Sequence, residues 1–317
     1  MKAHQLIQPH PTWQLHDSSK LDEAQTCLRK YFYRYTLGWA EESPNIHLHY
    51  GTSWHKAMEH LLLNDYSGAS VQQAHRAFVE EFTKHFSLDE TSYYPKTVEN
   101  AFTALLYYAA MYPSDHAEAK VEYTEISGTV PISSARVLHF RLDSILRRNA
   151  SGKLFSREHK TGSSKWLWAE QWYLAVQPGT YTHVLSCLYG PDQVEGIEMS
   201  GTFFPKKQKE WEPEFLRVPI RKTVPQMNQW LWLVNDKIDE IEQEYERLMR
   251  CDEGDTTLQA FPLNWTRCIN YGRLCPYHPF CLAWQNPLSH IAEPPIGFKL
   301  EYWNPAEQET RHKMEIK

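Results

Sequence analysis

Apolar residues recur at helical spacing in the first third of the chain and at alternate positions further on. Trp54, Met58 and Leu61 recur every three or four residues, which predicts a helix over 52–64. Ser19, with Asp22 three residues later, is suited to begin another helix, and Gly38 is suited to end it. The helices predicted in this part of the chain cover 19–37, 52–64, 70–87 and 97–112.

The pattern changes to a strand-like one after residue 120. In RVLHFRLDSILRR, His139, Arg141 and Asp143 share one face, and the leucines and Phe140 share the other. A turn signal at 149–152 follows, and KLFSREHKT comes directly after it, so the two segments are expected to form a hairpin. The remaining predictions are strands over 121–132, 195–204 and 213–220, a helix opening at 177, and a long helix over 223–250.

The order of these elements indicates the fold class. Helices come first, then three strands, then a helix, two strands and a long helix. This order suits an α/β fold with a central mixed β-sheet flanked by helices and with an N-terminal helical lobe. We expect a helical portion over 1–120, a core over 121–260 and a cysteine-rich segment over 261–317.

Composition and charge narrow the class of protein. The chain of 317 residues is 42% hydrophobic and 23% charged, as is usual for a globular protein. It has no apolar run of the roughly 18 residues that a membrane helix needs, and its start has no apolar stretch of the signal-peptide kind. We therefore expect an intracellular, cytoplasmic protein. The net charge of −6 excludes a globally basic nucleic-acid binder but not a local basic groove.

The predicted hairpin carries two carboxylates and a lysine. Alternation places Glu158 and Lys160 on one face of their strand and His159 on the other, and pairing can bring Asp143 beside Glu158. Two such carboxylates repel unless a cation lies between them. Mg²⁺ prefers carboxylate oxygens, and a lysine beside it can orient a water or stabilise developing phosphate charge. The pattern suits metal-assisted phosphodiester hydrolysis; the alternative is a salt-bridged surface hairpin.

This stretch resembles the PD-(D/E)XK nuclease superfamily, and within it the RecB-like exonuclease branch. The family motif is an Asp, then E-x-K on the following strand, then a helix bearing Gln and Tyr. The residues that match it here are Asp143, Glu158, Lys160, Gln177 and Tyr181. The resemblance covers about 20–281 and implies a restriction-endonuclease-like core. Because Pro178 and Gly179 follow directly, Gln177 is expected to precede its helix.

The resemblance also implies a further metal ligand. GTSWHKAMEHLL is similar to the helical histidine element of RecB-like nucleases, which implies that His55 joins Asp143 and Glu158 in binding Mg²⁺ or Mn²⁺. Glu59 lies one turn on, on the same face.

Three of the six cysteines fall within 14 residues, in CINYGRLCPYHPFC. Since intracellular proteins rarely carry disulfides, this density points to metal or cluster ligation. Some RecB-like relatives hold a [4Fe–4S] cluster with one early and three late cysteines, which implies the set Cys27, Cys268, Cys275 and Cys281 and a C-terminal segment that closes onto the N-terminal helix. Thiolates also suit Zn²⁺. A zinc site completed by His278 without Cys27, or unliganded cysteines, are the alternatives. Cys187 and Cys251 lie outside the spacing.

Local basic clusters suggest how a nucleic acid could bind. They are Arg29, Lys30 and Arg34; Arg147 and Arg148; and Lys206, Lys207 and Lys209. With Tyr31, Tyr33 and Trp211 among them, they could follow a single strand by charge and stacking. The resemblance implies a single-strand DNA exonuclease in repair, recombination or phage DNA processing.

The sequence also bears on possible partners of the protein and on alternative functions. The chain has no Walker A motif, so a helicase or recombination partner would act in trans. The alternatives are a non-catalytic DNA-binding repair or recombination subunit with a degenerate nuclease fold, and a zinc-stabilised interaction protein.

Overall fold

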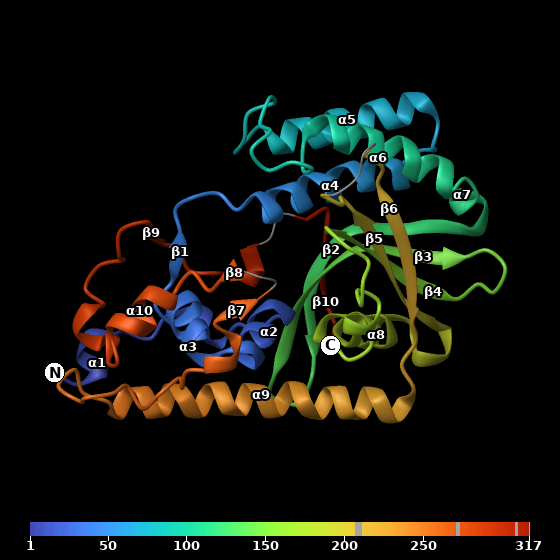
Figure 1. The fold of residues 1–317 in the computed structure, drawn as a ribbon. Coiled ribbons are helices and arrows are strands. Elements are labelled where there is room, and N and C mark those ends of the chain that lie inside the picture. The colour runs from blue at the N-terminus through green and yellow to red at the C-terminus, as the bar shows by residue number, and fades with distance from the viewer. Residues whose placement is uncertain (207–210, 271–272, 308–309, 317) are drawn as a thin grey trace. The chain divides into compact units, whose positions relative to one another are not determined.

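The computed structural model describes residues 1–206, 211–270, 273–307 and 310–316 (Figure 1). The chain divides into two compact units, and each gathers segments that are far apart in the sequence. The first unit consists of Met1–Ser43, Thr129–Phe140 and Pro225–Gln308. The second consists of Pro44–Gly128, Arg141–Val224 and Glu309–Lys317.

Helices and strands occur in groups along the chain, with four helices (α4–α7) before three successive strands (β2–β4). The helices are α1 (Ala3–Leu6), α2 (Ser18–Thr26), α3 (Leu28–Tyr31), α4 (Ile46–Leu63), α5 (Gly68–Phe82), α6 (Val98–Met111), α7 (Asp115–Glu118), α8 (Val176–Tyr189), α9 (Val224–Arg250) and α10 (His278–Ala283). The strands are β1 (Trp39–Glu41), β2 (Ala119–Pro131), β3 (Val137–Arg148), β4 (Leu154–Gly162), β5 (Val194–Phe203), β6 (Glu214–Ile220), β7 (Ile269–Asn270), β8 (Arg273–Leu274), β9 (Phe298–Leu300) and β10 (His312–Glu315).

A six-stranded mixed sheet is the centre of the architecture, in the order β10-β2-β3-β4-β5-β6. β3 and β4 form the predicted antiparallel hairpin, with Leu146 opposite Phe155. β4 and β5 run parallel and are joined through α8, because parallel neighbours need a crossover connection. β5 and β6 are antiparallel. The predicted fold class, a mixed sheet flanked by helices, is confirmed.

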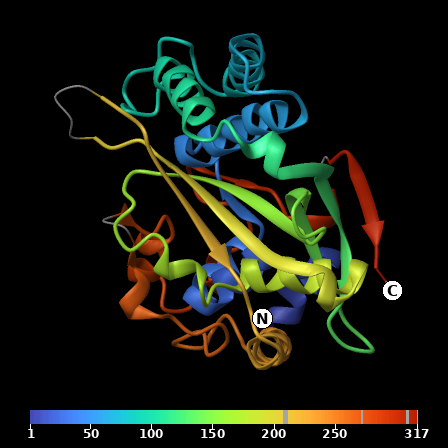
Figure 2. The ribbon, with the colours of Figure 1, turned by 90° about the vertical axis from the view of Figure 1, so that its right-hand side faces the viewer.

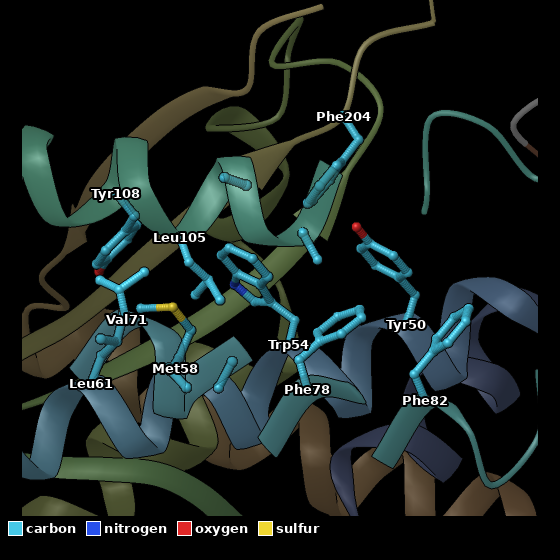
Figure 3. Packing of buried hydrophobic residues seen from close by; sticks show 14 of the residues in the cluster. Tyr50, Trp54, Met58, Leu61, Val71, Phe78, Phe82, Leu105, Tyr108 and Phe204 are labelled. Carbon is cyan, nitrogen blue, oxygen red and sulfur yellow. The ribbon is translucent and has the colours of Figure 1, made fainter. Parts of the chain in front are cut away.

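Helices cover both faces of the sheet in the second unit. α4, α5 and α6 lie on one side of its strands and α8 lies on the other (Figures 1 and 2). The three helices on the first side share a core in which Trp54 of α4, Phe78 of α5 and Leu105 of α6 are fully buried (Figure 3). The spacing of Tyr50, Trp54 and Met58 on α4 is the pattern that predicted this helix.

The first unit is built around stacked aromatic rings. Tyr31 lies parallel to Phe261, with ring centroids 6.1 Å apart. Tyr33 stacks on Trp39 at 5.4 Å and on Tyr277 at 5.3 Å, so residues near both ends of the chain share one core. Such rings bury much apolar surface, and their offset contacts add to that gain.

Two details of the sequence-based prediction were wrong. The helix expected over 19–37 is interrupted at Cys27, which is extended at φ −164° and ψ 113°. Asn264 stabilises this break, because its side-chain amide donates to the Thr26 carbonyl at 2.9 Å. Gln177 does not precede α8 but lies in its first turn, where the missing N–H of Pro178 leaves no hydrogen bond unmade.

In the described ranges, every helix is too short or too polar to span a bilayer.

Candidate active site

His55 reaches the site from α4, the helix whose apolar face forms the core of the second unit. The helix begins after Asn45, whose side chain accepts the His47 N–H at 2.9 Å. Trp54 is fully buried in the core, and the next residue, His55, has its Nδ1 2.9 Å from Oδ2 of Asp143. Packing of α4 therefore fixes the imidazole beside the carboxylate.

Asp143 lies on β3, beside the strand that carries the E-x-K sequence. Its Oδ2 accepts the backbone N–H of His159 on β4 at 2.9 Å. The side chain is 11% exposed, so the carboxylate is held from two sides in a nearly closed position. Continued from the pair Leu146 and Phe155, the antiparallel register of the hairpin places Asp143 opposite Glu158.

Glu158 is the most buried member of the group, with its side chain 3% exposed. Its Oε1 accepts from the Lys160 ammonium at 2.7 Å and from Nε2 of Gln177 at 3.2 Å. Gln177 also donates to the Tyr181 hydroxyl at 2.6 Å, one turn further along α8. The side chain of His159 lies on the other face of β4, against the Tyr108 ring. Five predicted site residues are thus brought together: His55, Asp143, Glu158, Lys160 and Gln177, with Tyr181 behind them.

The two carboxylates have opposite protonation behaviour. Burial and the neighbouring negative charge of Asp143 raise the pKa of Glu158 to about 7, although Lys160 opposes this. The pKa of Asp143 is lowered despite its burial, because His55 and Lys160 stabilise its charge. The pKa of His55 is raised, because Asp143 outweighs the effect of burial. A buried acid whose pKa lies near neutrality beside a second acid whose pKa is lowered is typical of functional sites.

The donor set fits a divalent cation in its chemistry. Oε2 of Glu158 is buried and has no hydrogen-bond partner among the described residues, and carboxylate oxygens are the ligands that Mg²⁺ prefers. The donors are, however, paired with one another rather than directed at a common point. In the described part of the chain, no group of three His, Cys, Asp or Glu side chains is arranged to hold a metal ion.

The sequence analysis missed a second ion pair beside the site. Glu125 of β2 is buried and receives a 2.8 Å contact from Arg141, two residues before Asp143. Burial and the charge of Asp143 raise the pKa of Glu125. Its φ of 47° lies in the left-handed region, which is unusual for a residue with a side chain. The shared face of Arg141 and Asp143 was the available signal, since it places both side chains on one side of β3.

Glu59, one turn after His55 on α4, is engaged in contacts with two other segments of the second unit. Its Oε1 lies 2.6 Å from Nε of Arg311 and accepts from the Thr124 hydroxyl at 3.0 Å. The carboxylate therefore connects α4 to β2 and to the C-terminal residues of the second unit.

The four cysteines of the predicted set lie near one another in the first unit. Cys275 N–H donates to the Cys268 carbonyl at 2.8 Å, and Cys281 follows in α10. Cys27, in the break between α2 and α3, accepts from the Asn264 N–H at 3.4 Å. All four thiols are free and partly buried, whereas Cys187 is exposed.

Electrostatics also indicates that these thiols are neighbours. Burial raises the pKa of Cys281 to about 11; Arg29 lowers it, and the other three thiols raise it further. Burial likewise raises the pKa of Cys275, and Cys27 contributes. Four thiols from both ends of the chain fit soft-metal ligation in their chemistry, although no three of them, as described, are arranged to hold a metal ion.

The expected stacking residues near Cys27 are core residues instead. Tyr31 and Tyr33 are fully buried. Arg29 is also buried, and its guanidinium donates to the carbonyls of Phe261, at 2.9 Å, and Leu258, at 3.1 Å. These residues hold the first unit together and do not present a surface to DNA.

The other expected nucleic-acid contacts are mostly engaged or outside the described residues. Arg147 lies 2.7 Å from Glu122, and Arg148 lies 3.2 Å from Glu195. Trp211 is partly buried and stacks on Phe204 at 5.7 Å. Lys207 and Lys209 lie outside the described residues.

Comparison with known proteins gives the family. Residues 18–282 match the model of the PD-(D/E)XK nuclease superfamily, which is most of the chain, so the protein belongs to this superfamily. The assignment supports a nuclease, a hydrolase of phosphodiester bonds in nucleic acid, and divalent metals such as Mg²⁺ are typical of the superfamily.

Other comparisons add little. No curated protein matches the chain. A solved structure, the crystal structure of SSO0001, is similar at 14% identity, over 70% of this chain and 84% of that one, with a TM-score of 0.25. A score this low does not establish a shared fold.

Proposed function

We propose that this protein is a Mg²⁺- or Mn²⁺-dependent deoxyribonuclease of the RecB-like branch that degrades single-stranded DNA from its ends. The observation that carries the proposal is that Asp143, Glu158 and Lys160 lie together and that both carboxylates are largely buried. Oε2 of Glu158 has no hydrogen-bond partner among the described residues. A salt-bridged surface hairpin would not bury two carboxylates together, because their mutual repulsion has no compensation there.

Each side chain has a part in the proposed chemistry. Asp143, Glu158 and His55 would hold the divalent ion, which lowers the pKa of a bound water and neutralises phosphate charge. Lys160 supplies a cationic group beside Glu158, and it would orient the attacking water or stabilise the charge that develops on the phosphate. Gln177 donates to Glu158 at 3.2 Å and to Tyr181 at 2.6 Å, and so positions the carboxylate.

The proposal includes a [4Fe–4S] cluster held by Cys27, Cys268, Cys275 and Cys281. Their proximity in the first unit supports it. Ligation would join residues more than two hundred positions apart, which stabilises a fold as a long-loop cross-link does. A zinc site would need only thiolates or a nearby imidazole, and iron analysis distinguishes the two.

Cleavage of defined substrates tests the proposal. End-labelled linear and circular single-stranded DNA, duplex DNA and RNA are incubated with anaerobically purified protein in Mg²⁺ or Mn²⁺. We expect cleavage of linear single strands, lost in Lys160→Ala with DNA binding retained. Lys153→Ala is the matched control, because that lysine is exposed and directly precedes β4.

Three results would contradict parts of the proposal. DNA binding without cleavage would indicate a non-catalytic subunit. Cleavage unchanged in Lys160→Ala would remove this site from the reaction. Zinc instead of iron and sulfide would remove the cluster.

A further inference from the structure

The segment 163–175 carries large apolar side chains that the fold leaves in solvent. Trp166 is 81% exposed and Leu174 is 88% exposed, and Leu167 and Tyr173 are also exposed. Single exposed apolar residues are ordinary, but four within nine residues form a local concentration that costs hydration free energy. Such a concentration points to a surface that is covered during function.

The position of this segment connects it with the proposed active site. It leaves the end of β4 three residues after Lys160 and enters α8 two residues before Gln177. The Trp172 ring lies 5.8 Å from the Lys160 ammonium. The indole N–H of Trp172 is buried and has no hydrogen-bond acceptor in the described part of the chain. Aromatic side chains therefore extend from the catalytic lysine to the surface.

The backbone of the segment is anchored, so its exposed rings are held in place. Trp168 is buried and meets Phe203 edge-on at 5.2 Å and Trp172 at 5.5 Å. Gly201 makes room for this anchor, because a Cβ there would lie 2.8 Å from the Trp168 ring. The Lys222 ammonium also donates to the Tyr173 carbonyl at 2.7 Å. A held platform loses less conformational entropy on binding than a loose one.

We propose that segment 163–175 is a base-stacking platform, with Trp166 and Tyr173 stacking on the unpaired bases that flank the scissile phosphate. The inference rests on the proposed nuclease function and specifies how the proposed active site binds its substrate. Stacking needs an open face of an unpaired base, and every base has one, so the platform favours single strands without reading sequence. The aromatic residues first expected to stack, Tyr31 and Tyr33, are fully buried and leave this role open.

A binding assay that combines changes in the protein with changes in the nucleic acid tests the platform. Binding of a fluorescein-labelled oligothymidylate and of an abasic oligonucleotide of equal length is measured in Ca²⁺, with wild type and Trp166→Ala. We expect Trp166→Ala to bind oligothymidylate about tenfold more weakly, because stacking on one ring contributes on that scale. The abasic strand should bind both proteins alike. Trp166→Phe, which keeps a ring, should recover most of the affinity.

Matched controls separate stacking from general exposure. Trp232→Ala removes a tryptophan that is 63% exposed on α9, and Tyr107→Ala removes a tyrosine that is 43% exposed, against 44% for Tyr173. Both controls should bind as wild type does, whereas Tyr173→Ala should bind oligothymidylate more weakly. In cleavage assays, Trp166→Ala should raise KM and leave kcat near the wild-type value.

The outcomes distinguish this inference from the proposed function. One result would overturn the platform alone: wild type cleaves single strands, but Trp166→Ala binds the oligothymidylate and the abasic strand as tightly as wild type does. That result would favour a protein partner for these side chains. A wild-type protein that neither binds nor cleaves single strands would overturn both. Loss of kcat instead of affinity in Trp166→Ala would also contradict stacking.

Discussion

Glu158→Gln should make the metal-free protein more stable at pH 8 while it abolishes cleavage. The carboxylate is buried, and its pKa is raised from the ordinary 4.5 to about 7 by burial and by Asp143. A folded-state pKa above the unfolded one means that ionisation of Glu158 disfavours the fold. Stability is therefore lost as the pH rises from 4.5 to 7, and the whole cost is present above pH 7.

The size of this cost follows from the two pKa values. One pKa unit corresponds to about 1.4 kcal/mol, so the difference between 4.5 and about 7 amounts to about 3 kcal/mol for this buried group. Glutamine has nearly the shape of a protonated glutamate and keeps an oxygen for the Lys160 ammonium. The variant should therefore equal wild type below about pH 4.5 and exceed it by up to about 3 kcal/mol at pH 8.

Urea unfolding in EDTA at several pH values between 5 and 8 measures the effect. Glu80→Gln, which changes an exposed carboxylate on α5, is the control and should follow the wild-type curve. Saturating Mn²⁺ should stabilise wild type more than Glu158→Gln, because the variant keeps Asp143 but lacks the second negatively charged ligand. Parallel stability curves for wild type and Glu158→Gln over the whole pH range would refute the reasoning.

Three further predictions concern the same two units. Asp143→Asn should weaken Mn²⁺ binding in calorimetry and lower the pKa of Glu158, since Asp143 raises it; an unchanged metal affinity would contradict its role as a ligand. Cys27→Ser should lose iron and acid-labile sulfide while Cys187→Ser keeps both, and iron retained in Cys27→Ser would exclude that thiol from the cluster. Arg29→Ala should lower the free energy of unfolding in urea by about 2–3 kcal/mol, because buried carbonyls lose charged donors. The dependence of DNA affinity on salt concentration should stay the same. A weaker salt dependence in the variant would make Arg29 a phosphate contact.

The local periodicity of apolar residues was sufficient to predict the helices and strands that bury one face. The hairpin of β3 and β4 could be predicted because alternation and the turn at 149–152 both act over a few residues. The same alternation placed Glu158 and Lys160 together and His159 on the other face, as their contacts now show. These side chains could be located because residues two positions apart on a strand point to the same face of the sheet.

Contacts between segments far apart in the sequence determine the features that hydrophobic periodicity did not predict. The helix break at Cys27 depends on Asn264, and the burial of Arg29 depends on carbonyls near residue 260. A tyrosine beside an arginine looks the same in sequence whether it faces a core or a nucleic acid. Exposure separates Tyr31, which is buried, from Trp166, which is not, and exposure is a property of the assembled fold.

The topology explains why a substrate-binding platform would lie at this point of the chain. β4 and β5 are parallel, so the chain must leave the end of β4 that carries Lys160 and cross over through α8. The connection then starts at one proposed catalytic residue and ends beside Gln177, whatever its own sequence. Within this connection, Trp168 packs against Phe203 of β5 and anchors the segment to the sheet. If both proposals hold, hydrolysis and strand binding are separable in this fold: hydrolysis would depend on the buried carboxylates held by the sheet, and strand binding on the exposed rings in the crossover connection.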